Sequence, residues 1–135
     1  CLVRNGDVLF NRTNSPELVG KTAIFRETKP MAYAGYLIRL RVNRENDPEY
    51  LACFLNTSYS KRVLRGMCKS IIGMANINAT EVQAIRIPQP PVRMQSEFAH
   101  RVAGVEKVKS IHRAALTEFN MLFSSLQYRA FRGDL

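Results

Sequence analysis

The apolar residues in the last third of the chain recur every three or four positions. Residues 92–131 contain no proline and one glycine, Gly104. This spacing is the period of one helix face, so the pattern predicts a single helix. At a rise of about 1.5 Å per residue, the helix would be on the order of 57 Å long. The side chains predicted to form its interface are Phe98, Val102, Val105, Val108, Ile111, Ala115, Phe119, Leu122 and Leu126.

A helix of this length cannot lie along a domain of fewer than a hundred residues over its whole extent. Its apolar stripe therefore predicts a partner helix in a coiled coil, either a second helix of the same type or the same helix of a homodimer. A strict seven-residue repeat would place Lys109 and His112 on the contact seam, so the supercoil handedness stays open. The alternative is a lone amphipathic surface helix.

The first two thirds of the chain show shorter patterns. Alternating apolar positions predict a strand over residues 34–42, and short apolar runs predict strands over 8–10, 19–25 and 85–87. The segment 11–16 reads as a polar loop, and residues 70–76 read as irregular. The predicted fold class is α+β, with a small mixed part followed by a long coiled-coil-type α-helix.

Helix-start signals occur at two places in this part. Asp47 followed by Pro48 is typical of a helix N-cap and first position. A second helix is predicted over Ser58–Met67. Asn78 with Glu81 resembles a capping box, which would start a short helical turn.

The chain has 135 residues, of which 46% are hydrophobic, as in a globular domain. No apolar run approaches the ~20 residues of a membrane-spanning helix. Cys1, Cys53 and Cys68 are odd in number and lack metal-ligand spacing, so we expect reduced thiols in a cytoplasmic protein. Because the chain begins with Cys1 and its first residues read as a strand already under way, we expect a fragment of a longer protein.

Charge is distributed unevenly along the chain. The formal net charge is +9, from 20 basic and 11 acidic residues, which favours a polyanionic partner. Residues 50–80 contain no Asp or Glu but contain Lys61, Arg62, Arg65 and Lys69. If the second helix continued, Lys61, Arg65 and Lys69 would share one face. These residues are predicted to contact nucleic-acid phosphates; the alternative is a solvated helix face.

The polar segment that begins at residue 11 adds side chains suited to base edges. Arginine pairs bidentately with guanine, and asparagine pairs bidentately with adenine. The alternative is an ordinary polar loop. With Lys21, the predicted DNA-binding residues outside the second helix are Asn11, Arg12, Thr13 and Asn14.

The sequence lacks the signals of a catalytic site. It contains no glycine-rich phosphate loop and no dinucleotide fingerprint. His100 and His112 have no Cys, Asp or Glu arranged as co-ligands, and no acidic pair suggests a nuclease metal site. We therefore expect no catalytic residues, metal or cofactor in this chain.

The order of several motifs is similar to that of a known family. They are Gly6-Asp7-Val8-Leu9-Phe10-Asn11-Arg12, the strand 35–40, Pro48-Glu49-Tyr50-Leu51, Phe54-Leu55-Asn56, Ala75-Asn76-Ile77-Asn78, Ile85-Arg86-Ile87-Pro88-Gln89-Pro90-Pro91 with Gln95, and the segment 125–135. The chain resembles the DNA specificity subunit of type I restriction–modification systems over nearly its whole length.

This resemblance implies the later part of a target recognition domain in residues 1–87, and a proline junction with a conserved spacer helix in 88–135. In the family, two recognition domains each read half of a split site on double-stranded DNA, and two helices pack antiparallel. Modification subunits bring S-adenosylmethionine, and restriction subunits bring ATP hydrolysis, with its Mg²⁺, and cleavage. The implied role is non-catalytic DNA recognition. Two alternatives are an assembly module that docks modification subunits and the recognition end of a fused methyltransferase–nuclease.

Overall fold

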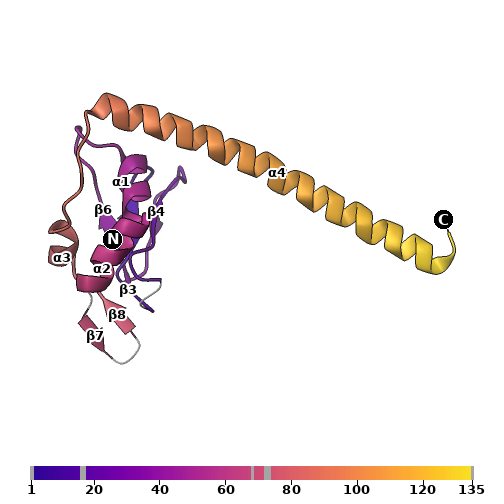
Figure 1. Cartoon of the computed structure of the whole chain (residues 1–135), viewed down its shortest axis with the longest axis horizontal. Helices are drawn as coiled ribbons and strands as arrows, with labels where there is room; N and C mark the ends of the chain where they lie inside the picture. The colour runs from indigo at the N-terminus through magenta and orange to yellow at the C-terminus, as the bar shows by residue number, and fades with distance from the viewer. Residues whose placement is uncertain (1, 16–17, 68, 72–73, 135) are drawn as a thin grey trace. The chain divides into compact units, whose positions relative to one another are not determined.

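The structure, a computed structural model, describes residues 2–15, 18–67, 69–71 and 74–134 (Figure 1). The chain divides into two units, residues 1–99 and residues 100–135. The described elements are short antiparallel strands, three short helices and one long helix, so the predicted α+β class is confirmed.

The first unit contains a three-stranded antiparallel sheet in the order β4-β2-β6. Its central strand β2 (Val8–Asn11) pairs with β4 (Thr22–Ile24) and with β6 (Leu37–Leu40). A two-stranded sheet joins β1 (Leu2–Val3) to β5 (Met31–Ala32). Gly6, at a φ of 84°, supplies the turn between β1 and β2.

A second three-stranded antiparallel sheet has the order β3-β8-β7. Its strands are β3 (Thr13–Asn14), β8 (Met74–Asn76) and β7 (Lys69–Ile71). The predicted loop over 11–16 and the predicted irregular stretch over 70–76 were therefore both wrong. Thr13 and Asn14 form a strand because the distant strand β8 supplies their pairing partners, whereas β7 and β8 pair with each other.

The helices begin where the sequence predicts. Asp47 caps α1 (Pro48–Leu55) by accepting hydrogen bonds from the amides of Glu49 (2.8 Å) and Tyr50 (3.3 Å). The helix α2 (Ser58–Met67) has the predicted bounds. It ends before Lys69, which lies in β7, so Lys69 does not share a helix face with Lys61 and Arg65.

The Asn78 carboxamide and the Glu81 carboxylate form the predicted capping box at the start of α3 (Ala79–Gln83). The following residues 85–87 are not a strand, which contradicts the prediction. Ile85 and Ile87 instead pack against the core, which satisfies their apolar side chains without a strand partner. The core itself contains Phe10, Val19, Leu55, Leu64, Ala75, Ile77 and Val82.

The helix α4 (Val92–Arg132) has 41 residues and confirms the predicted long helix. Gly133, at a φ of 76°, ends it in the left-handed conformation typical of a helix stop. Its first turns belong to the first unit, where Gln95 is fully buried. In the described part of the chain, no helix combines the length and the apolar content needed to cross a membrane.

Candidate nucleic-acid interface

The β3-β8-β7 sheet brings together residues that are far apart in the sequence. Asn76 on the central strand pairs with Thr13 on one side and with Lys69 on the other. We call these three register positions the Asn76 row. Asn76 is exposed, whereas the preceding residue, Ala75, is 1% exposed and belongs to the core. Since successive strand residues face opposite sides, Asn76 lies on the outer face of the sheet.

Arg12 joins this row through its side chain. Its guanidinium Nη2 donates to the Oδ1 of Asn76 at 3.4 Å, and the Thr13 hydroxyl donates to the same oxygen at 3.2 Å. The backbone of Arg12 is held at both ends, because its amide donates to the Tyr36 carbonyl (3.0 Å) and its carbonyl accepts from the Ile77 amide (2.9 Å). The structure therefore fixes the base of this arginine and directs its charged end to the outer face.

Asn11 and Asn14 are less free than the sequence suggested. The Oδ1 of Asn11 accepts a hydrogen bond from the Thr13 amide (3.3 Å), and the Oδ1 of Asn14 accepts one from the Ser15 amide (2.8 Å). Both carboxamide oxygens thus support the local backbone, as asparagine side chains often do in turns. Neither oxygen is a fully available acceptor for a base edge.

The two predicted lysines outside the row lie close to Asn11. The Asn11 amide donates to the Lys21 carbonyl (2.8 Å), and the Asn11 carbonyl accepts from the Gly20 amide (2.7 Å). The ammonium of Lys61 on α2 donates to the Gly20 carbonyl. Burial and the nearby charge of Lys21 lower the pKa of Lys61 to about 8. Two mutually repelling cations beside a polar strand end favour the binding of an anion.

Gly20 fixes the turn that carries this lysine pair. It adopts a φ of 75°, which disfavours any side chain. A Cβ at this position would also lie 2.5 Å from Cδ1 of Leu64, a core residue of α2. The close approach of the turn to α2 is what brings Lys61 near Lys21.

The remaining predicted cations stand on α2. Arg62 and Arg65 are exposed, while Ser60 and Leu64 on the same helix are buried. The structure therefore splits the predicted basic cluster into three parts: Lys61 beside Lys21, the exposed arginines on α2, and Lys69 in the Asn76 row. Sequence reasoning missed Asn76 as a site residue, although its position in the motif 75–78 was a signal.

Other basic residues are neutralised within the fold. Asp7, which is 6% exposed, accepts from Nε of Arg41 at 3.0 Å and lies 3.9 Å from Nη1 of Arg39. Arg26 pairs with Glu49 at 2.7 Å. These pairs leave the arginines of β6 and its surroundings less suited to phosphate than those of α2.

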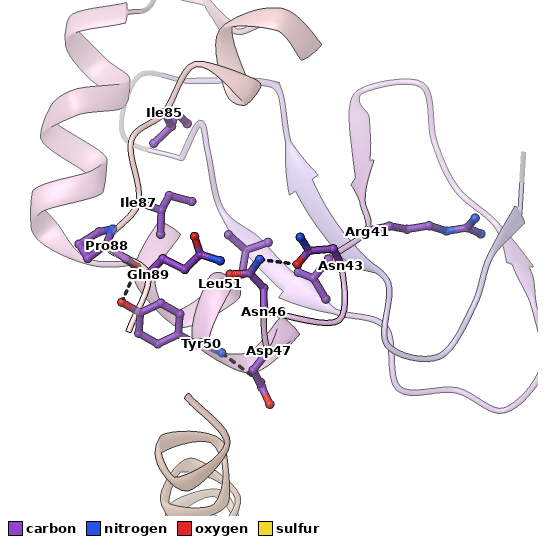
Figure 2. Close-up of a pocket in the computed structure, with 11 residues that line it drawn as sticks. Arg41, Asn43, Asn46, Asp47, Tyr50, Leu51, Ile85, Ile87, Pro88 and Gln89 are labelled. Atoms are coloured by element: carbon purple, nitrogen blue, oxygen red, sulfur yellow. Dashed lines mark hydrogen bonds between the residues drawn. The ribbon is translucent and has the colours of Figure 1, made fainter. Parts of the chain in front are cut away.

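A pocket of about 430 Å³ lies beside the start of α1 (Figure 2). The hydroxyl of Tyr50 donates to the Pro88 carbonyl at 3.0 Å, and Nδ2 of Asn46 donates to Oδ1 of Asn43 at 2.5 Å. Asp47, also on its wall, caps α1. Because these polar groups bind one another, we assign the pocket no ligand.

The predicted interface residues of α4 present their apolar side chains to solvent. Val105 is 58% exposed, Ile111 59% and Phe119 67%, while Val102 and Ala115 are half-buried. Phe98, at the start of the helix, instead packs edge-on against Tyr50, with ring centroids 6.0 Å apart. Exposed apolar stripes of this kind are typical of interaction surfaces.

Potential metal ligands and thiols are scattered through the fold. In the described ranges, no three His, Cys, Asp or Glu side chains are grouped so that they could hold a metal ion. Cys53 is a half-buried thiol outside any disulfide. Cys1 and Cys68 lie outside the described residues.

Comparisons with known proteins bear on the resemblance directly. No family model matches the chain. The chain is 29% identical over 140 residues to the type I restriction enzyme EcoKI specificity subunit of Escherichia coli strain K12, which covers 98% of this chain and 30% of that protein. It is 27% identical over 140 residues to the type I restriction enzyme StySPI specificity subunit of Salmonella potsdam, with the same two coverages, 98% and 30%.

A third relative, the putative type I restriction enzyme MjaX specificity subunit of Methanocaldococcus jannaschii, is 34% identical over 97 residues, which covers 70% of this chain and 23% of that protein. The chain thus spans less than a third of the length of these relatives. The similarity extends from the short strands into the long helix, and it confirms the resemblance carried by the motifs. The chain is homologous, over nearly all of its length, to a segment of the specificity subunits of type I restriction enzymes.

Proposed function

We propose that this chain recognises a specific sequence of double-stranded DNA as part of the specificity subunit of a type I restriction–modification enzyme. The observation that carries the proposal is the similarity to two such subunits over 98% of the chain. The outer face of the β3-β8-β7 sheet adds physical support, because it combines arginine, threonine and asparagine side chains next to a lysine pair. These are the groups that bind base edges and phosphates.

In this proposal the two parts of the chain have different tasks. Residues 1–87 form the later part of a target recognition domain, and residues 88–135 form the junction and the spacer helix. The apolar stripe of α4 pairs with a second helix, either within a longer subunit or in a homodimer. This pairing explains why a helix of 41 residues exposes Val105, Ile111 and Phe119.

The chain itself would perform no catalysis. Modification subunits would supply S-adenosylmethionine and transfer its methyl group, and restriction subunits would supply ATP hydrolysis with Mg²⁺ and cleavage. Such an enzyme acts on DNA in the cytoplasm. The contribution of this chain is to position those subunits at one DNA sequence.

A second candidate function is an assembly module without DNA recognition. The exposed stripe of α4 favours it, because this surface suits a protein partner rather than a polyanion. The two candidates differ in one measurable property: DNA recognition requires salt-dependent binding to duplex DNA, and an assembly module does not.

The test uses the protein as its gene encodes it, assembled with its modification subunits and presented with a random duplex library. Wild-type enzyme should select one sequence. A variant with Asn11, Arg12 and Asn14 all changed to Ala removes the Arg12 guanidinium and the NH₂ donors of both asparagines, so it should relax the preference at one or two positions, each worth about 1–3 kcal/mol. The control is Arg113→Ala, an exposed change on α4. A wild-type enzyme that selects no sequence would contradict the proposal.

A further inference from the structure

Asn76 accepts two hydrogen bonds on a single oxygen. Its Oδ1 receives Nη2 of Arg12 at 3.4 Å and Oγ1 of Thr13 at 3.2 Å. A guanidinium carries only donors, so the carboxamide has to turn its oxygen toward Arg12. The NH₂ group of Asn76 therefore points away from Arg12 and Thr13, on a residue that is exposed.

Arg12 is held more firmly than an ordinary surface arginine. Its backbone bonds to Tyr36 and to Ile77 on either side. In the part of the chain that the structure describes, its Nε is buried and has no hydrogen-bond partner. The stem of the side chain is thus enclosed, and Asn76 restrains the guanidinium at its outer end. Less side-chain entropy is lost when such an arginine binds a partner.

The exposed edge formed by these two side chains consists of donors. Arg12 offers the Nη hydrogens that Asn76 does not accept, and Asn76 offers its NH₂ group. In the major groove, guanine presents two acceptors, N7 and O6, whereas adenine presents one acceptor and one donor. An asparagine that binds adenine needs both its oxygen and its NH₂ group, and the oxygen of Asn76 is already occupied.

We propose that Arg12 and Asn76 together recognise a guanine in the DNA target, with Arg12 contacting the base and Asn76 acting as the positioning residue for its guanidinium. This inference rests on the proposed function and names one base of the DNA target that the chain would recognise. The same donors would also suit phosphate oxygens, and the experiment must separate these two acceptors.

The experiment measures base preference at each position of the target with the assembled enzyme and a duplex library randomised one position at a time. Asn76→Leu should reduce the guanine preference at a single position about tenfold or more and leave the other positions unchanged. Arg12→Gln should shift the same position from guanine toward adenine, since a Gln carboxamide offers one donor and one acceptor.

Asn76→Asp provides a rescue variant. Its carboxylate still accepts from Arg12, so the guanine preference should survive, although the added negative charge should weaken binding to all duplexes alike. Arg86→Gln, a change of an exposed arginine outside the site, is the matched control and should leave the profile unchanged. Thermal melting of each variant shows that it is folded.

Three results would overturn the inference. Uniform weakening by Asn76→Leu and Arg12→Gln, with a smaller dependence on salt, would assign both residues to phosphate. An unchanged base profile in both Asn76→Leu and Arg12→Gln would mean that neither residue contacts the DNA. Loss of the guanine preference in Asn76→Asp would mean that Asn76 does not position Arg12. Each of these leaves the proposed function intact, whereas absence of any sequence selection by the wild-type enzyme would contradict both.

Discussion

Replacing Gln95 should weaken the packing of the first turn of α4 against the rest of the first unit. The carboxamide oxygen Oε1 accepts from the Asp47 amide at 2.9 Å, and Nε2 donates to the carbonyls of Glu45 (3.2 Å) and Pro90 (2.8 Å). Gln95 is 0% exposed, so water does not replace these partners while the fold stays closed. One side chain thus links the first turn of α4, the proline junction and the cap of α1.

The three hydrogen bonds of Gln95 set the size of the expected loss in the free energy of unfolding. A typical intramolecular hydrogen bond contributes about 0.5–1.5 kcal/mol net, so three contribute about 1.5–4.5 kcal/mol. Gln95→Met keeps the approximate volume of the side chain, so the loss comes from the three bonds and from the backbone groups left without a partner. For a unit of roughly a hundred residues, 1 kcal/mol corresponds to about 4–8 °C in Tm. A loss near the middle of the range should lower Tm by more than about 10 °C.

Urea unfolding and thermal melting of the purified protein measure this change. The matched control is Gln127→Met, the same substitution at an exposed position of α4, which should cost less than about 0.5 kcal/mol. If Gln95→Met and Gln127→Met lowered the free energy of unfolding equally, the three bonds would contribute nothing and the reasoning would be refuted.

The remaining predictions concern binding, pH, assembly and spacing. Changing Arg62 and Arg65 to Gln should weaken binding to all duplexes and reduce the salt slope by ~0.9 per lost phosphate contact, which titrations at several salt concentrations measure; an unchanged slope would contradict it. The pKa of Lys61 is about 8 in the folded protein, against an ordinary value of 10.5. The folded state therefore disfavours the charged form of this lysine relative to the unfolded state. The free energy of unfolding of the wild-type protein should therefore rise as the pH increases from about 8 to 10.5. The variant Lys61→Met has no charge at this position and should show no such rise, which urea unfolding midpoints across this pH range would test. Phe119→Lys should dissociate the two paired helices, because burying a large apolar side chain is worth about 1.5–3 kcal/mol. If sedimentation showed the same assembly state for this variant and the wild type, the prediction would be wrong. Four residues inserted at 107–110 lengthen α4 by ~6 Å and rotate the rest of the helix by roughly 400°, so methylation mapping should find a spacer one or two base pairs longer with the same half-sites; an unchanged spacer would contradict it.

The elements that the sequence predicted correctly depend on local physics. The cap at Asp47 and Pro48, the capping box at Asn78 and the period of α4 each involve residues within one or two turns. The residues that form their hydrogen bonds and apolar faces are therefore close together in the sequence. The bounds of α2 were predicted correctly for the same reason.

The errors concern segments whose structure depends on the residues that they pair or pack with. Thr13 becomes part of a strand because Asn76 pairs with it, 63 residues later in the chain. Lys69 leaves the helix for the same sheet, which changed the predicted basic cluster. Conversely, Ile85 and Ile87 alternate like a strand but find a core instead of a partner strand. The chemistry of the candidate site was visible in the sequence, but its grouping around Asn76 required the sheet.

Neighbouring residues of the strand β8 differ in what limits their substitution. Ala75 faces the core and Asn76 faces outward, so core packing constrains mutation at Ala75 far more than at Asn76. If Asn76 takes part in recognition as proposed, a substitution at residue 76 would change the binding preference while the fold is kept. On the proposed function, this alternation would let the binding preference change at little cost to stability.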